Sequence, residues 1–331
     1  MRCFYLINQL EVVGIGRISI RKRLAGSQKT TGRFPAEFIG GIMTDRHSIS
    51  TRTQVCAVIG NPVAHSLSPA IHNAAYRHSG LDFVYVAHQV VDLKHALAGM
   101  RAFRNFRGLS VTIPHKIEVM KYVDDITAAD RAIGSINTVI HEKDRLIGLG
   151  TDGPGALKAF GDAGTEIDGK AILMLGAGGA ARAIAFTLAI NRKLRELMLL
   201  DIDEAMRQVL AADLKAGTDA AIKSESLTER TLAEAMATAD IIIHCTPIGM
   251  HPKVNASLVP VELFRPGQVV FDAVYTPLET KLLRDARFCG LTAISGVEMF
   301  INQAALQFEQ FTGQNAPVDV MRQVVMEHLT A

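Results

Sequence analysis

One segment limits the possible folds more than any other: residues 171–201 place an apolar run, a glycine-rich turn and a helical pattern before a second apolar run. Strand, turn, helix and strand in that order form a βαβ unit with parallel strands. The turn follows the pattern GxGxxG/A, with small residues at Gly176, Gly178 and Ala181. Because a turn without side chains lets backbone amides and a helix N-terminus approach a pyrophosphate, the segment predicts a dinucleotide-binding domain of the Rossmann type. A glycine turn of purely structural use is the alternative.

The acidic residue that ends the second apolar run bears on the choice of dinucleotide. Asp201 follows the glycine turn at about the 20-residue spacing typical of these domains. A carboxylate there accepts hydrogen bonds from ribose hydroxyls and repels a 2′-phosphate, so we expect NAD to be preferred over NADP. Asp201 could instead only cap the next helix, and Arg207 could reach a phosphate, so NADP remains possible.

The same alternation of strand-length and helical patterns begins at Gln54, which predicts an α/β protein. With 331 residues, the chain is long enough for two domains. Gly153-Pro154-Gly155 is expected to mark a hinge between them and to precede a helix that reaches Phe160. Strands are predicted at residues 55–60, 84–88, 109–112, 138–141, 146–149, 171–175, 197–200, 241–244 and 269–273, and helices at 69–79, before 102, from 114 and from 298 to the end.

Charge and cysteine content exclude several classes of protein. The 35 basic and 33 acidic residues give a net charge of +2, which is no electrostatic footprint for nucleic acid. The four cysteines are scattered and no His or Cys cluster has metal-ligand spacing, so we expect a reduced, cytoplasmic protein without a metal. Residues 171–190 approach the length of a membrane span, but they contain Arg182 and three glycines and are better explained as the strand, turn and helix above.

The first 50 residues have no clean periodicity and carry a basic cluster at residues 17–23. This segment could be an organelle-targeting peptide, a disordered arm, or upstream sequence translated from a wrongly chosen start, with Met43 as the true one. We therefore expect residues 1–50 to be an N-terminal extension outside the fold.

Polar residues at helix starts suggest a site for a small acid. Ser68 is expected to cap a helix that begins at Pro69, and with Ser66 it places two hydroxyls at a helix N-terminus, which could bind a carboxylate. Capping alone is the alternative for Ser68.

A lysine and an aspartate could supply acid–base chemistry. A helix is expected to begin at Pro114, which would put Lys116 in its first turn, lower the lysine pKa and suit it to proton transfer. Asp152, at the predicted hinge, could pair with Lys116 in a cleft between the domains. The alternatives are a solvated lysine and an aspartate that caps the helix after Gly153.

These motifs resemble those of the shikimate and quinate dehydrogenases, over about residues 54–329. The similar segments are SLSP at 66–69, VTIPHK at 111–116, INT at 136–138, TDGPG at 151–155, GAGGAARA at 176–183, CTPIGM at 245–250, VYTPLET at 274–280 and GVEMFINQA at 296–304. The resemblance implies a substrate domain with a mixed sheet, at residues 51–152 and completed by C-terminal helices at 298–331, beside a Rossmann domain at 153–297.

The resemblance also implies a role for each matched residue. Lys116 and Asp152 would be the catalytic pair in the NAD(P)-dependent interconversion of shikimate and 3-dehydroshikimate, or of quinate and 3-dehydroquinate. The implied substrate-binding residues are Ser66, Ser68, Thr112, Asn137, Tyr275 and Gln303. The implied cofactor-binding residues are Gly176, Ala177, Gly178, Gly179, Ala180, Asp201, Thr246, Met250, Val274 and Gly296.

The sequence departs from the usual family pattern at three asparagines, which are replaced by Ser110, Gly150 and His244. These changes raise the alternative of an aminoshikimate or other altered-substrate dehydrogenase, and a catalytically silent NAD-binding sensor is a further one. Family members that use NADP tend to carry Asn-Arg-Thr after the second Rossmann strand, where this chain has residues 201–203, Asp-Ile-Asp. We expect a small-molecule substrate, no nucleic acid or membrane partner, a monomer or homodimer, and a place in the shikimate pathway or in quinate catabolism.

Overall fold

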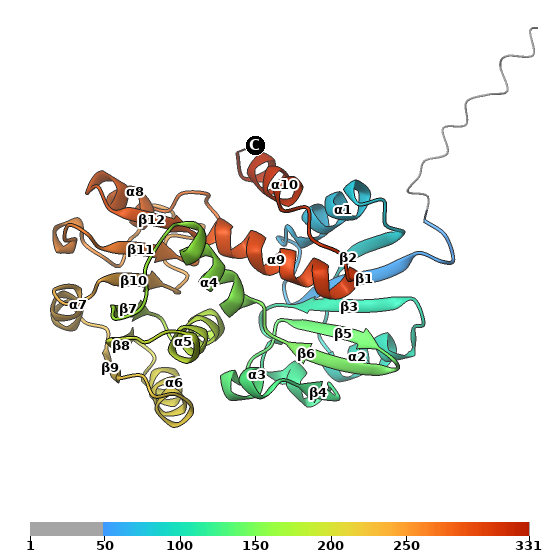
Figure 1. Ribbon diagram of the computed structural model, residues 1–331, viewed down its shortest axis with the longest axis horizontal. Coiled ribbons are helices and arrows are strands. Elements are labelled where there is room, and N and C mark those ends of the chain that lie inside the picture. Colours follow the sequence, from blue (N-terminus) through green and yellow to red (C-terminus); the bar gives the residue numbers. More distant parts are fainter. Residues whose placement is uncertain (1–48, 331) are drawn as a thin grey trace, which may run out of the picture. The chain divides into compact units, whose positions relative to one another are not determined.

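The computed structural model describes residues 49–330, which belong to one compact unit. The predicted extension, except for residues 49 and 50, and the candidate start at Met43 lie outside the described residues. Two six-stranded sheets form the framework (Figure 1). The expected α/β fold is confirmed, since one sheet is mixed and the other is parallel.

The first sheet is mixed and has the strand order β2-β1-β3-β5-β6-β4. Its strands are β1 (Gln54–Gly60), β2 (Phe83–Gln89), β3 (Phe106–Val111), β4 (Asp125–Ile126), β5 (Thr138–Glu142) and β6 (Arg145–Leu149). Helices α1 (Ser68–His78), α2 (Leu93–Ala102) and α3 (Ala128–Ile133) and the 3₁₀ helix η1 (Glu118–Lys121) lie between them in sequence. β5 runs antiparallel to both of its neighbours, which makes the sheet mixed.

Alternate residues of β1 face two different cores, as the two-residue period of a strand requires. Cys56 and Val58 pack in the core that contains residues of α1 and the C-terminal helices. Ala57 and Ile59 pack on the opposite side, with residues of α2. Since both of its faces are covered, β1 has a continuous hydrophobic run from Val55 to Ile59.

The second sheet is entirely parallel, in the order β12-β11-β10-β7-β8-β9. Its strands are β7 (Ala171–Leu175), β8 (Glu196–Asp201), β9 (Ile222–Ser226), β10 (Ile241–His244), β11 (Val269–Asp272) and β12 (Thr292–Ser295). The associated helices are α4 (Asp152–Asp162), α5 (Gly179–Asn191), α6 (Glu204–Gly217), α7 (Glu229–Met236) and α8 (Lys281–Phe288), with the 3₁₀ helix η2 (Val261–Leu263). Numbered from β7, the order is 6-5-4-1-2-3, which is the doubly wound Rossmann arrangement.

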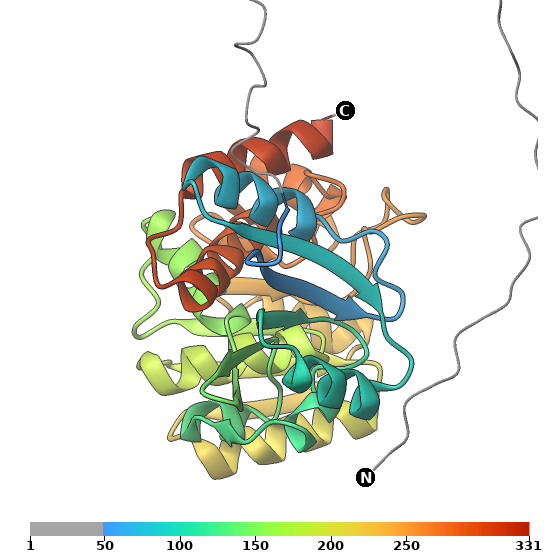
Figure 2. The ribbon, with the colours of Figure 1, turned by 90° about the vertical axis from the view of Figure 1, so that its right-hand side faces the viewer.

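The C-terminal helices α9 (Gly296–Thr312) and α10 (Val318–Thr330) return the chain to the first sheet. α9 contacts β12, from which it continues, and also β3 and β5 (Figure 1). α10 packs against α1, and Figure 2 shows the red C-terminal helices beside the blue-green α1. The C-terminal helices thus contact elements of the first sheet region, and the domain limits stay predictions.

Several local predictions were wrong. The terminal helix is not continuous, because Gly313 takes a left-handed conformation and ends α9. The residues Gly153-Pro154-Gly155 lie inside α4 rather than before it. Strands β9 and β12 were not predicted: they are the two edges of the second sheet, and Ile222 and Ile294 are their only buried residues.

Within residues 49–330, no helix is both long and apolar enough to span a bilayer. The apolar stretch that resembled a span is β7 followed by the glycine turn and α5. The prediction that it folds as strand, turn and helix is confirmed.

Gly153 is required by close packing of α4 on α5. A β-carbon at Gly153 would lie 1.9 Å from Thr187 Oγ1 and 2.7 Å from the Ala183 carbonyl oxygen. We expect Gly153→Ala to lower the free energy of unfolding by about 1–3 kcal/mol, because the added methyl overpacks this contact. Gly161, in the same helix, has open space around a β-carbon, so Gly161→Ala should raise stability by about 0.5–1 kcal/mol. Urea unfolding measures the free energy of unfolding of both variants. Equal changes in that free energy would contradict the packing argument.

His72 on α1 is fully buried, and neither ring nitrogen has a hydrogen-bond partner. Its ring stacks on Tyr85 with 4.3 Å between the ring centroids. Burial lowers the pKa of His72 from 6.5 to about 3, because the charged form loses its solvation. Since the folded-state pKa lies below the unfolded-state value, this residue favours folding above pH 6.5, and that contribution is lost as the pH falls toward 3.

We therefore expect acid to destabilise the protein through His72, by about 3 kcal/mol between about pH 7 and about pH 4. Urea unfolding at several pH values measures this term. His72→Leu should remove most of it, whereas His78→Leu, at an exposed position on the same helix, should leave it in place. An unchanged pH dependence in the His72 variant would show that other groups cause the acid sensitivity.

Candidate active site

The predicted catalytic pair is formed. Lys116 Nζ lies 2.6 Å from Asp152 Oδ2, and the two side chains are 20% and 13% exposed. Lys116 comes from the turn after β3, and Asp152 is the first residue of α4. The pair is therefore shielded from bulk water but remains open enough for a substrate to reach it.

The helix expected at Pro114 is absent: residues 113–117 form a turn, and only the short η1 follows. Tertiary hydrogen bonds fix this turn, since the Lys116 carbonyl accepts from Ile136 N–H at 3.0 Å and the His115 ring lies 2.8 Å from the Val90 carbonyl. The argument that placed Lys116 at a helix end was thus wrong. The charge that faces Lys116 is the carboxylate of Asp152.

Asp152 is positioned by residues from two other elements. Its Oδ2 accepts from Lys116, and its Oδ1 accepts from Asn137 Nδ2 at 2.9 Å. The N-cap of α4 is Thr151, which makes no side-chain capping bond, so the alternative that Asp152 caps this helix is not what the structure shows. Two donors on different oxygens hold the carboxylate in one orientation.

Asn137 connects the Lys116–Asp152 pair to α9 through buried polar groups. Its Oδ1 accepts from the Thr151 N–H at 2.7 Å, and its Nδ2 also lies 2.9 Å from Thr151 Oγ1. The Thr151 hydroxyl donates to Gln303 Oε1 at 3.3 Å. Thr151 was mentioned in the sequence only as the neighbour of Asp152, and its part in this network depends on tertiary contacts that no local pattern signals.

These groups line one pocket of about 180 Å³. All eight residues predicted as catalytic or substrate-binding contribute to its wall, and so do Ala180 and Gly296 from the predicted cofactor set. The remaining lining residues are Val58, Ser110, Val111, Ala273, Met299, Phe300 and Gln307. The structure therefore brings together residues from the first sheet, from the start of α5, from the segment after β11 and from α9.

Two serine hydroxyls face this pocket at the start of α1. The N-cap of α1 is Leu67, without a side-chain capping bond, and Ser68 is the first helical residue. Ser66 Oγ accepts from the Ser68 N–H at 3.3 Å. The capping role predicted for Ser68 is therefore wrong, and both hydroxyls line the pocket beside unpaired amides of the helix N-terminus.

An aromatic pair forms another part of the wall. Tyr275 stacks on Phe300 of α9, with 4.7 Å between the ring centroids and an angle of 12° between the planes. Burial raises the pKa of Tyr275, so its hydroxyl stays protonated and can donate a hydrogen bond. Phe300 was not singled out in the sequence, although it lies within the matched segment 296–304.

A buried chain of hydroxyl and amide groups forms the floor of the pocket. Tyr85 Oη donates to Ser110 Oγ at 2.6 Å, and Ser110 Oγ donates to Gln307 Oε1 at 2.7 Å. Burial raises the pKa of Tyr85 and keeps it a donor. Gln307 was missed in the sequence; its signal is a second glutamine, four residues after Gln303, on the buried face of α9.

The glycine turn between β7 and α5 has the shape that a dinucleotide needs. Gly176 has a φ of +111°, and a β-carbon there would lie 2.9 Å from the Cys245 carbonyl oxygen. At Gly178 and Gly179, in contrast, an added β-carbon would meet no atom within 4 Å. The backbone is therefore open on the side where the N-terminus of α5 begins, and a pyrophosphate fits the open side.

The other predicted cofactor residues lie around this turn. Asp201 Oδ2 accepts from the Ala177 N–H at 2.6 Å. The methyl group of Thr246 lies 3.2 Å from the position of a β-carbon at Gly176. Met250 is 40% exposed and Val274 is buried, so the Val274 side chain is not free to reach a cofactor in this arrangement.

The structure excludes two alternatives raised by the sequence: that Asp201 caps α6, and that Arg207 reaches a phosphate. Asp203, not Asp201, caps α6, because its side chain accepts from the Met206 N–H. Arg207 is only 6% exposed, and its guanidinium donates to Ser224 at 2.7 Å and Ser226 at 3.4 Å. The cation that could have reached a phosphate therefore faces β9 instead.

Among residues 49–330, no three His, Cys, Asp or Glu side chains are grouped so that they could hold a metal ion. The pocket holds an amine that can exchange a proton, that of Lys116, and amide and hydroxyl groups around it that can orient a ligand.

Comparison with known proteins identifies the family. Residues 58–139 match the model of the shikimate dehydrogenase substrate binding domain, and residues 296–326 match that of the shikimate 5′-dehydrogenase C-terminal domain. A shikimate dehydrogenase (NADP(+)) of Bacillus cereus is 41% identical over 280 residues, which cover 83% of this chain and 99% of that protein.

Two solved structures have the same fold. The shikimate 5-dehydrogenase from Listeria monocytogenes, in complex with shikimate and NAD, has a TM-score of 0.79 and 33% identity, covering 84% of this chain and 98% of that one. The quinate dehydrogenase from Corynebacterium glutamicum, in complex with NAD, has a TM-score of 0.78 and 27% identity, covering 83% and 99%. The chain belongs to the shikimate and quinate dehydrogenase family.

Proposed function

We propose that this protein is an NAD(P)-dependent dehydrogenase that interconverts shikimate and 3-dehydroshikimate, with quinate and 3-dehydroquinate as the related pair. The observation that carries the proposal is the Lys116–Asp152 pair, which faces the same pocket as Ser66 and Ser68. Ala180, which directly follows the glycine turn, also lines that pocket, as does Gly296 at the start of α9. In this proposal, Ser66 and Ser68 bind the carboxylate of the substrate, Lys116 transfers the proton, and the dinucleotide binds at the adjoining glycine turn.

In this proposal, the neutral amine form of Lys116 takes the proton of the ring hydroxyl during oxidation, and the ammonium form, which pairs with Asp152, returns it during reduction. Asp152 lies beside that hydroxyl and accepts a hydrogen bond from Lys116, which keeps the lysine in place. Asn137, bonded to Asp152 Oδ1, fixes the carboxylate while protons move. The bound nicotinamide supplies the acceptor or donor of the hydride, and the protein aligns the reacting carbon with it.

Substrate orientation depends on the two ends of the pocket. The hydroxyls of Ser66 and Ser68 would bind the substrate carboxylate at the start of α1. Thr112, Asn137 and Gln303 would hold the ring hydroxyls, and Tyr275 would cover the ring. The pocket wall is fixed by buried hydrogen bonds, so little of this arrangement needs to form on binding.

We further propose that NAD is the preferred dinucleotide, although the Bacillus cereus relative is named for NADP(+). Asp201 lies at the end of β8 against the glycine turn, where its charge would repel a 2′-phosphate. Arg207, the nearby cation, is buried against β9. A preference for NAD favours oxidation of the alcohol and therefore a catabolic role.

The alternative substrate, an amino analogue of shikimate, rests on the three replaced asparagines. Ser110 lines the pocket, and its hydroxyl is already engaged by Tyr85 and Gln307. A silent NAD-binding sensor is the weaker alternative, because it gives no reason for Lys116 and Asp152 to form a close pair. We keep a cytoplasmic, monomeric or homodimeric protein without nucleic-acid or membrane partners as part of the proposal.

Steady-state kinetics with shikimate, quinate and their amino analogues, each with NAD and NADP, test the function. We expect turnover with shikimate or quinate and higher kcat/KM with NAD. Turnover only with an amino analogue would favour the altered-substrate alternative. Tight NADH binding without turnover of any cyclic acid would favour the sensor.

The role of Lys116 gives a sharper prediction. Lys116→Ala should lower kcat by about 10²–10⁴-fold, as expected for the loss of a general base, while NADH binding is retained. Lys121→Ala is the matched control, because Lys121 is exposed on η1 and has no part in the pocket. Near-normal turnover in the Lys116 variant would rule out the proposed proton transfer.

The role of Asp201 is tested by neutralising it. Asp201→Asn keeps an acceptor for the Ala177 N–H but removes the charge that would oppose a 2′-phosphate. We expect the ratio of kcat/KM for NADP to that for NAD to rise by about tenfold or more, which corresponds to roughly 1.4 kcal/mol. Asp203→Asn is the control, since asparagine caps a helix equally well. An unchanged ratio in the Asp201 variant would assign dinucleotide choice to other residues.

A further inference from the structure

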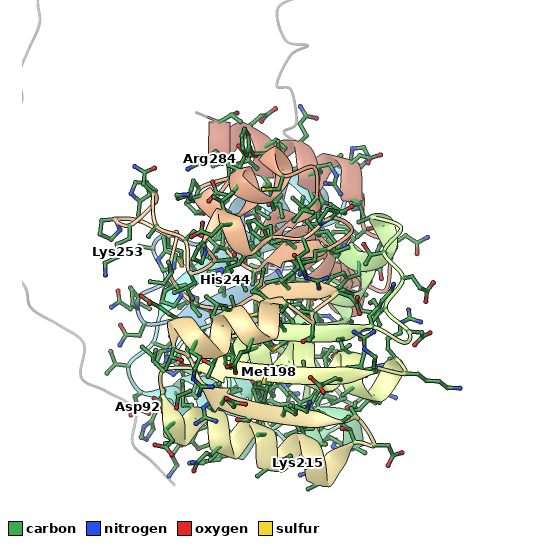
Figure 3. All side chains as sticks on the ribbon, turned by 90° about the vertical axis from the view of Figure 1, so that its left-hand side faces the viewer. Asp92, Met198, Lys215, His244, Lys253 and Arg284 are labelled. Atoms are coloured by element: carbon green, nitrogen blue, oxygen red, sulfur yellow. The ribbon has the colours of Figure 1, made fainter. Side chains whose placement is uncertain are left out.

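A buried histidine ends β10 beside the glycine turn, at one of the three positions where the sequence departs from the family pattern. Figure 3 labels this residue, His244, on the second sheet. It is 2% exposed and pairs in register with Asp272 of β11, which is fully buried. An imidazole has two nitrogens that can form hydrogen bonds, and both nitrogens of His244 have a partner.

The two ring nitrogens of His244 connect a carboxylate to a hydroxyl. Nδ1 lies 2.9 Å from Asp272 Oδ1, and Nε2 lies 2.5 Å from Thr246 Oγ1. Asp272 also accepts from the Val274 N–H and from the Thr280 hydroxyl. Because an ionised carboxylate only accepts hydrogen bonds, Nδ1 of His244 carries a proton.

The presence or absence of a proton on His244 Nε2 therefore decides whether the Thr246 hydroxyl donates or accepts in their hydrogen bond. Its Oγ1 also accepts from the Ile248 N–H at 3.3 Å. If Nε2 is unprotonated, the hydroxyl must donate inward to it, and Oγ1 offers only a lone pair to a ligand. If Nε2 is protonated, it donates to Oγ1, and the hydroxyl proton is free to point outward.

Thr246 lies where a bound dinucleotide would meet it. Its methyl group is 3.2 Å from the β-carbon position at Gly176, the first glycine of the turn. The residue is partly exposed, whereas His244 behind it is buried. A change of proton on His244 would thus reach the ligand only through the Thr246 hydroxyl.

Few ionisable groups surround His244 in the described part of the chain. β7 presents Leu175 opposite it and contributes only apolar side chains, and β11 contributes Asp272. Burial and the Asp272 charge raise the pKa of the neighbouring Cys245 thiol, which stays neutral. Asp201 lies across the turn, where it binds the Ala177 N–H. Asp272 is thus the charged group in direct contact with the ring.

We propose that His244 is a positioning residue for the dinucleotide, whose protonation switches the Thr246 hydroxyl from hydrogen-bond acceptor to donor and so makes dinucleotide affinity depend on pH. The inference rests on the proposed function, because it assumes that NAD(P) binds at the glycine turn. It assigns to this chain a control of affinity that an asparagine at this position cannot supply, since an amide does not titrate.

The test measures the Kd of NADH by the fluorescence of the bound nucleotide at several pH values between about 5.5 and about 8. The proteins are the wild type, His244→Asn, Thr246→Val and the double variant. We expect a pH-dependent Kd in the wild type and a flat profile in His244→Asn. The Thr246→Val profile should be flat as well, and the double variant should bind as Thr246→Val does, because the histidine acts through the hydroxyl.

His141→Asn is the matched control, because His141 is also buried on a strand but lies on β5 of the first sheet. It should keep the wild-type profile. If His244→Asn does not fold, as thermal unfolding would reveal, His244→Gln takes its place. At one pH, the His244 variants should bind NADH about two- to tenfold more weakly, as expected for one hydrogen bond.

Two results would overturn the inference: a pH profile that His244→Asn shares with the wild type, or losses of affinity that multiply in the double variant. Absence of NADH and NADPH binding by the wild type at every pH is a different failure. It would overturn the proposed function and, with it, the inference.

Discussion

The ion pair of Lys116 and Asp152 is the interaction on which the arrangement of the site depends. Removing a lysine and a carboxylate from water is unfavourable unless their remaining hydrogen bonds are satisfied. Here Asn137 binds the second oxygen of Asp152, and the backbone of Lys116 is held by Ile136. The pair thus requires the turn after β3, the segment before β5 and the start of α4 to meet at one point.

Helix packing brings these segments together. α4 carries Asp152 at its first position and packs against both α5 and α9. Gly155 makes the second contact possible, because a β-carbon there would lie 2.9 Å from the Gln303 backbone nitrogen. The same helix, α9, supplies Gln303 and Gln307 to the pocket. The close packing of α4 on α9 therefore also fixes where Asp152, Gln303 and Gln307 lie in the pocket.

Sequence reasoning succeeded where the chemistry is local and failed where tertiary contacts decide the backbone. The glycine turn, the strands around it and the proximity of Lys116 to Asp152 were predicted. The helix at Pro114 was not formed, because long-range bonds to Lys116 O and to the His115 ring hold a turn instead. The edge strands β9 and β12 are short and each has a single buried residue, so they carry little hydrophobic pattern. The role of Gln307 depends on a helix that arrives from the far end of the chain.

The three replaced asparagines lie in different surroundings, and this bears on substrate choice. Gly150 donates its N–H to Asp130, and any side chain there would lie 2.7 Å from the Asp130 carboxylate. His244 bridges Asp272 and Thr246 on the second sheet. Of the three, only Ser110 lines the substrate pocket. Among the three replacements, Ser110 is therefore the one placed to change which ring hydroxyls the pocket accepts, whereas Gly150 contacts Asp130 and His244 lies beside the glycine turn.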